Sequence, residues 1–135
     1  MSDTEPREGR DAGRPPRLAP ARFASGQVAF NDLRREVADL LRTYGAEVLV
    51  DDAMVIVTEL ANNAALHAGT AFEVRGQLTD HVFRIEVGDT GTGQPVVNGG
   101  LGLRLVGRLA SRWGVSSDPP GKVVWAELNR TDRRR

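Results

Sequence analysis

The chain has 135 residues, the size of one domain with a single hydrophobic core. Its 18 basic and 18 acidic residues give a formal net charge of zero, which argues against the basic surface typical of nucleic-acid-binding domains. The absence of cysteine excludes disulfides, thiolate metal sites and a cysteine nucleophile, and two histidines make a histidine-rich metal site a poor candidate. No apolar run approaches the roughly 18 residues that span a membrane. The first residues also lack the apolar core of a signal peptide, so we expect a soluble, cytoplasmic protein.

The two ends of the chain differ in composition from its middle. Residues 1–21 combine proline, glycine, arginine and acidic residues with few apolar side chains. Such a segment buries too little surface to offset the entropy lost on ordering, which predicts a disordered tail. Residues 130–135 form a short basic tail with an expected role in solubility; contact with phosphate or a partner is the alternative. The folded domain is therefore expected to span residues 22–129.

The spacing of apolar residues predicts three helices and two hairpins in this domain. Spacing at three and four residues indicates helices over residues 27–44, ended by Gly45, and 50–68. Alternation indicates two hairpins. The remaining expectations are strands at residues 71–78, 81–89, 113–118 and 122–128, a glycine-rich loop at 90–100 and a helix at 101–113. This order predicts an α/β (α+β) two-layer sandwich, with a mixed, mostly antiparallel sheet covered on one face by helices.

The second predicted helix carries two polar residues on a side that is otherwise largely apolar. At about 100° per residue, one face forms a core seam made of Val50, Met54, Val57, Ala61, Ala64 and Ala68. Glu59 and Asn63 lie on the other side, about 40° apart. That side also contains Val55, Ile56 and Leu66, so it is too apolar for an ordinary solvent-facing surface. On spacing alone, a solvent face and the wall of a pocket both remain possible.

Two glycine clusters follow this helix in the sequence. Asp89 ends a predicted strand next to the first cluster, where its carboxylate could accept a hydrogen bond from the amino group of a base. The second cluster directly precedes a predicted helix, whose unpaired N-terminal amides favour an anion. Each cluster alone is weak evidence, because turns and helix caps use glycine as well. The dinucleotide fingerprint and the phosphate-loop signature are both missing.

Taken together, these patterns resemble a known superfamily. E-L-x-x-N-A in a helix, D-x-G-x-G after a strand and G-x-G-L before a helix resemble, in this order, the N box and two glycine boxes of GHKL ATPases. More narrowly, the stretches VTELANNAALHA, GLGLRLVGRLASRWGV and GKVVWAEL are similar to bacterial anti-sigma-factor serine/threonine kinases, especially those of actinobacteria. The resemblance covers residues 22–129.

The resemblance implies a site for ATP and Mg²⁺. Glu59 would be the general base, and Asn63 the Mg²⁺ ligand. Asp89 would read the adenine amino group, with Gly91 and Gly93 beside the base. Residues 94–99 would form a lid over the nucleotide. The second glycine box, which would contribute backbone to the phosphates, corresponds to Gly100, Leu101, Gly102 and Leu103.

Several nearby residues receive less specific interpretations. Asn62 creates a mild register ambiguity, but the four-residue step from Glu59 favours Asn63 as the metal ligand. His67 is expected to cap the helix end more than to bind phosphate. Lys122 is expected to be an exposed turn residue, and the tryptophans, Trp113 and Trp125, to belong to the core.

The resemblance also implies a function. Family members phosphorylate a serine or threonine of an anti-anti-sigma protein of the STAS fold and, when not bound to it, hold a sigma factor inactive. The resemblance also implies a homodimer. We expect no membrane association and no direct contact with nucleic acid. An ATP-binding module that regulates a partner with little or no catalysis remains an alternative. The core of a two-component histidine kinase is disfavoured, because the first 45 residues contain no histidine.

Overall fold

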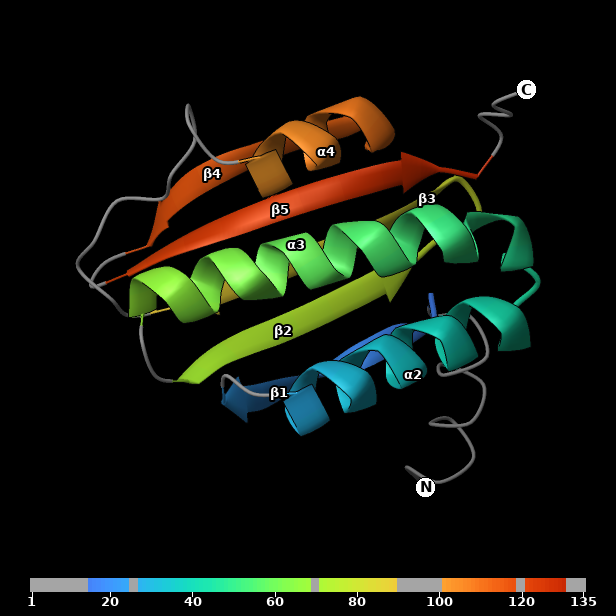
Figure 1. Cartoon of the computed structure of the whole chain (residues 1–135). Coiled ribbons are helices and arrows are strands. Elements are labelled where there is room, and N and C mark those ends of the chain that lie inside the picture. The colour runs from blue at the N-terminus through green and yellow to red at the C-terminus, as the bar shows by residue number, and fades with distance from the viewer. Residues whose placement is uncertain (1–14, 25–26, 69–70, 90–100, 119–120, 131–135) are drawn as a thin grey trace, which may run out of the picture.

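The computed structural model describes residues 15–24, 27–68, 71–89, 101–118 and 121–130. These form a five-stranded sheet with helices on one face, which confirms the predicted two-layer α+β sandwich (Figure 1). The elements in chain order are β1 (Arg17–Ala24), α2 (Gln27–Thr43), the 3₁₀ helix η1 (Glu47–Leu49), α3 (Val50–Ala68), β2 (Ala71–Leu78), β3 (Val82–Asp89), α4 (Leu101–Leu109), β4 (Arg112–Asp118) and β5 (Gly121–Asn129). Within the described ranges, no helix has the length and apolar character needed to cross a membrane.

The sheet has the strand order β1-β2-β3-β5-β4. A mixed, mostly antiparallel sheet was expected, and every described strand pair is antiparallel. The predicted hairpin between β2 and β3 is closed by the Thr79 hydroxyl, which accepts hydrogen bonds from the amides of His81 and Val82. Such side-chain bonds stabilise tight turns without requiring glycine.

Strand β1 corrects the expected boundary of the disordered tail. Residues 17–21 were assigned to the tail, yet they form most of a strand that pairs with β2 from Arg17 opposite Gln77 to Ala24 opposite Ala71. The strand has no regular alternation of apolar and polar residues, and it contains Pro20 and an irregularity between Leu18 and Ala21. Its order comes from main-chain pairing with a strand some fifty positions away, which composition does not reveal. Residues 1–14 lie outside the described ranges.

Helix α4 is shorter than predicted. It ends at Leu109, whereas the helix was expected to continue to Trp113. The amide of Ser111 donates instead to the carbonyl of Glu127 on β5, which starts the pairing of β4 with β5. Leu109 and Trp113 are four residues apart, so their spacing imitates a helical stripe although Trp113 belongs to β4.

The core lies between the helices and the sheet. The predicted seam of α3 is largely confirmed: Val50, Val57, Ala61 and Ala64 are buried, and Met54 is partly buried. Ile56 and Leu60, on other sides of α3, are buried too. Figure 1 shows the reason, since α3 crosses the sheet between α2 and α4 and packs against both. A helix with neighbours on both flanks buries much of its circumference, which accounts for its apolar residues all round.

Candidate functional site

Helix α3 places Glu59 and Asn63 one turn apart, in the part of the helix that leads to its C-terminal end. Glu59 is partly exposed. Asn63 is 9% exposed and is one of two polar or charged residues that the described part of the chain buries. The helix therefore turns Asn63 inward, whereas the preceding Asn62 is exposed. This difference favours Asn63 over Asn62 as the member of the pair that contacts a ligand.

The Asn63 amide has unused bonding capacity. No hydrogen bond joins its side chain to another of the described residues. Buried side-chain amides are normally hydrogen-bonded, and the described residues leave this one able to bind a water or a ligand. Its oxygen is a hard donor of the kind that Mg²⁺ takes. Elsewhere in the described ranges, no group of three or more His, Cys, Asp or Glu residues could hold a metal by itself. These residues fit a Mg²⁺ that takes one protein oxygen and completes its coordination with phosphate oxygens and water.

Strand order brings the other predicted site elements to the same end of the molecule. Asp89 is the last residue of β3 and pairs in register with Lys122 on β5. Figure 1 shows the start of β5 and the C-terminal end of α3 at the left of the view, and the start of α4 above them and nearer the middle. Helix α3 contacts α4, β3 and β5, so the N-box helix lies against the elements that begin or end near Asp89.

The second glycine box coincides with the first turn of α4. The helix begins at Leu101, continues through Gly102 and buries Leu103, which is 3% exposed. Leu103 therefore helps to fix α4 to the core, and the unpaired amides are those of the first turn of α4. Gly91, Gly93, Gly100 and the predicted lid at residues 94–99 lie outside the described residues.

Lys122 and Trp125 differ from their predicted environments. Lys122 was expected to be an exposed turn residue, but it is 8% exposed and lies in β5. It shares the helix-covered face with Val124, Ala126 and Leu128, so strand alternation could have revealed it. Trp125 was expected in the core, and the same alternation places it on the opposite face, with the Arg84 guanidinium 4.3 Å from its ring centroid. Trp113 packs against the core as expected.

Comparison with known proteins identifies the family. Residues 23–128 match the model of the histidine kinase-like ATPase domain. The chain belongs to this family. The match covers the three boxes and confirms the resemblance to GHKL ATPases, and membership of an ATPase family implies that the nucleotide is ATP. A comparison with curated proteins finds no match.

The fold is also similar to a solved structure. A chain from the crystal structure of the SiaB–SiaC complex of Pseudomonas aeruginosa superposes with a TM-score of 0.57, over 96% of this chain and 98% of that chain. The two sequences are 13% identical, so the likeness shows a shared fold. It extends over nearly the whole length of both chains.

Proposed function

We propose that this protein is an ATP-binding anti-sigma factor and serine/threonine kinase that phosphorylates a STAS-domain anti-anti-sigma protein in a partner-switching system. One observation carries the proposal: a partly exposed Glu59 lies one helical turn from a buried Asn63 whose amide has no hydrogen-bond partner among the described residues. Glu59 lies at the middle of α3 and Asn63 in its C-terminal half, and this helix contacts α4 and β3, the strand that ends at Asp89. Base and metal ligand would then lie side by side at the nucleotide phosphates.

Each residue has a distinct role in this proposal. Asp89 accepts a hydrogen bond from the adenine amino group, and amides at the start of α4 face the phosphates. Asn63 would hold a Mg²⁺, and that ion would supply positive charge that stabilises the phosphates. Glu59 accepts the proton of a serine or threonine hydroxyl as that oxygen attacks the γ-phosphorus. The bond from the γ-phosphorus to its bridging oxygen breaks, and ADP leaves.

The proposed protein partners rest on the resemblance to one branch of the family, whereas the nucleotide follows from the family itself. The sigma factor, the STAS protein and the homodimer follow from the resemblance of the three boxes to anti-sigma-factor kinases. The SiaB–SiaC structure is itself a complex of two proteins, and its fold likeness is compatible with a regulator that works by protein contact. A cytoplasmic location follows if the partner is a sigma factor.

A second candidate function is an ATP-binding module that controls its partner by contact, with little or no phosphoryl transfer. One observation favours it: no hydrogen bond or ion pair from the described residues orients the Glu59 carboxylate. General bases work best when a neighbouring group fixes their direction. The two candidates share the ATP site and differ in whether Glu59 moves a proton.

The deciding experiment separates binding from transfer with the variant Glu59→Gln. Under the kinase proposal, this variant binds ATP within about threefold of wild type, while transfer of labelled γ-phosphate to serine-containing STAS proteins falls about 100-fold or more. Glu47→Gln, an exposed carboxylate on η1, is the matched control and should change neither quantity. Equal transfer by Glu59→Gln would contradict the base role. ATP binding with no transfer by wild type would support the contact module instead.

A further inference from the structure

The sheet face that carries no helix holds an ordered layer of charged side chains. Arg84 binds Glu86 at 2.8 Å and Glu127 at 2.7 Å, and Arg75 binds Glu73 at 3.0 Å. Burial by itself would lower the pKa of the Arg84 guanidinium, but hydrogen bonds and charge from Glu86 and Glu127 outweigh it and raise this pKa above its ordinary value. The face therefore carries a connected set of partly exposed ion pairs centred on Arg84.

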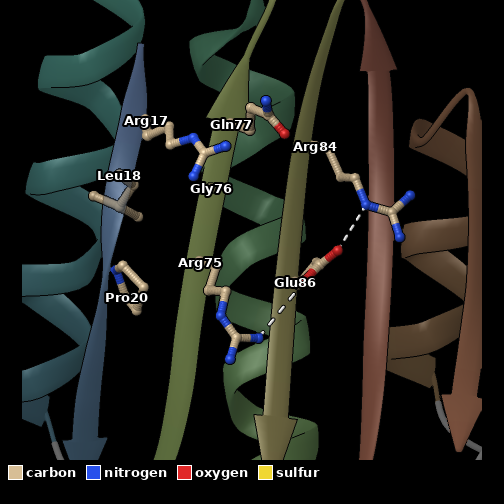
Figure 2. A pocket seen from close by; sticks show the side chains of 8 residues that line it. All are labelled: Arg17, Leu18, Pro20, Arg75, Gly76, Gln77, Arg84 and Glu86. Carbon is tan, nitrogen blue, oxygen red and sulfur yellow. Dashed lines mark hydrogen bonds and ion pairs between the residues drawn. The ribbon is translucent and has the colours of Figure 1, made fainter. Parts of the chain in front are cut away.

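A pocket of about 120 Å³ opens on this face where β1 departs from regular pairing. The register of β1 against β2 shifts between Leu18 and Ala21, and Pro20, within that interval, has no amide to donate. Bulges of this kind locally separate strands and redirect side chains, often next to binding sites. The pocket is lined by Arg17, Leu18, Pro20, Arg75, Gly76, Gln77, Arg84 and Glu86 (Figure 2).

Two of the three arginines at the pocket have acidic partners, and the third has none among the described residues. Glu86 forms ion pairs with both Arg84, at 2.8 Å, and Arg75, at 3.8 Å. Arg17 is exposed, and its side chain makes no hydrogen bond or ion pair with any other described residue. Arg84 also pairs with Glu127 and Arg75 with Glu73, so Arg17, at the β1 side of the pocket, is the lining arginine that has no acidic partner within the described residues (Figure 2). A guanidinium presents paired N–H donors whose geometry matches a carboxylate.

We propose that this pocket receives the carboxylate of an aspartate or glutamate side chain from a partner protein that docks on the uncovered sheet face. The cavity is small compared with the roughly 300–1,000 Å³ sites that enclose free small molecules, so it suits one side chain. The surrounding face supplies the rest of an interface, with Trp125 stacked under Arg84. Tryptophan and arginine are the residue types that most often dominate binding energy at interfaces.

The site is independent of the proposed nucleotide site. The pocket faces away from the helices, whereas Glu59 and Asn63 lie in the helical layer on the other side of the sheet. Acidic partners would therefore bind with or without ATP. The variant Asn63→Ala, which removes the proposed Mg²⁺ ligand, should leave binding at the pocket unchanged.

The test uses two blocked peptides, one with four glutamates between Gly-Ser flanks and one with four glutamines. Amide chemical shifts of the ¹⁵N-labelled full chain are followed during titration at low ionic strength, because salt screens exposed charges. The glutamate peptide should give saturable shifts at Arg17, Gly76 and Gln77, and the glutamine peptide should give none. Arg17→Gln should weaken glutamate-peptide binding about fivefold or more, and Arg17→Lys less. Arg108→Gln, an exposed arginine on α4, is the control and should change binding less than about twofold.

Several outcomes would overturn the proposal. These are equal binding of the two peptides, equal binding by Arg17→Gln and wild type, or shifts confined to the helical layer. Succinate that binds as tightly as the glutamate peptide would assign the pocket to a free small acid. A change in self-association of Arg17→Gln in sedimentation, with peptide binding unchanged, would assign it to a second copy of this chain.

Discussion

The two faces of the sheet differ although the same strands build both. Along β3, Phe83, Ile85 and Val87 point into the core, while Arg84 and Glu86 between them point to the uncovered face. One face is apolar and covered by helices, and the other holds salt bridges that remain partly open to water. We therefore expect stability to depend mainly on the covered face and recognition of acidic partners to depend on the uncovered one. The covered side departs from this rule at Asn63 and Lys122, which are buried and polar.

The largest expected loss of stability distinguishes two neighbouring residues on opposite faces of β3. Phe83→Ala removes a ring that is 2% exposed and leaves a cavity, so the free energy of unfolding should fall by about 3–5 kcal/mol. Val82→Ala, one position earlier and only partly buried, should cost less than about 1.5 kcal/mol. Urea unfolding of both variants measures the difference. Equal losses would contradict the assignment of stability to the covered face.

A middle-sized effect is expected where Trp125 lies over Gly114. A Cβ added at Gly114 would lie 2.9 Å from Cζ2 of Trp125, so Gly114→Ala must displace the ring and should cost about 1–3 kcal/mol. At Gly88, the nearest side-chain atom would be 3.4 Å away, which is an ordinary contact. Gly88→Ala is therefore the control, with an expected change within about 1 kcal/mol. Chemical denaturation followed by tryptophan fluorescence reports both stability and ring environment. An unchanged emission spectrum in Gly114→Ala would show that the ring does not cover Gly114.

The smallest effect concerns the ion pair between Arg84 and Glu127. The pair is partly exposed, so a double-mutant cycle with Arg84→Gln and Glu127→Gln should give a coupling energy of about 0.5–1 kcal/mol. The coupling should shrink at about 1 M salt, where charges are strongly screened. The exposed pair of Arg35 and Asp32 on α2 is the comparison and should couple less. A larger coupling on α2 would show that the charged face of the sheet is no more ordered than the rest of the surface.

The sequence predicted the features that local spacing determines. The three- and four-residue steps of α3 identified its seam, Thr79–Asp80 marked a turn, and Gly45, with φ of 79°, ends α2 as expected. Non-local pairing was less visible. Strand β1 depends on β2 and contains Pro20 and a register shift, so neither composition nor alternation identified it.

In the candidate site, too, residues close in sequence were easier to predict than features that depend on strand pairing. Glu59 and Asn63 were recognisable because both lie on one helix four residues apart. Lys122 and Trp125 were misplaced because single residues were read without the alternation of β5, which assigns them to opposite faces. The pocket at the β1 bulge could not be predicted, since it exists only where two strands distant in sequence meet. Gly91, Gly93 and Gly100 lie outside the described residues, so their roles stay predictions.

We propose above all that the helix-covered side of the fold binds ATP with Mg²⁺ through Asn63, the inward-facing asparagine of α3. Calorimetry with ATP and Mg²⁺ on wild type, Asn63→Ala, Asp89→Ala and Asn62→Ala tests it most directly, because Asn62 is the exposed neighbour of Asn63. We expect micromolar-range binding by wild type and Asn62→Ala, with both other variants weaker by about tenfold or more, a loss of roughly 1.4 kcal/mol. No binding by wild type, or equal losses in Asn62→Ala and Asn63→Ala, would contradict it.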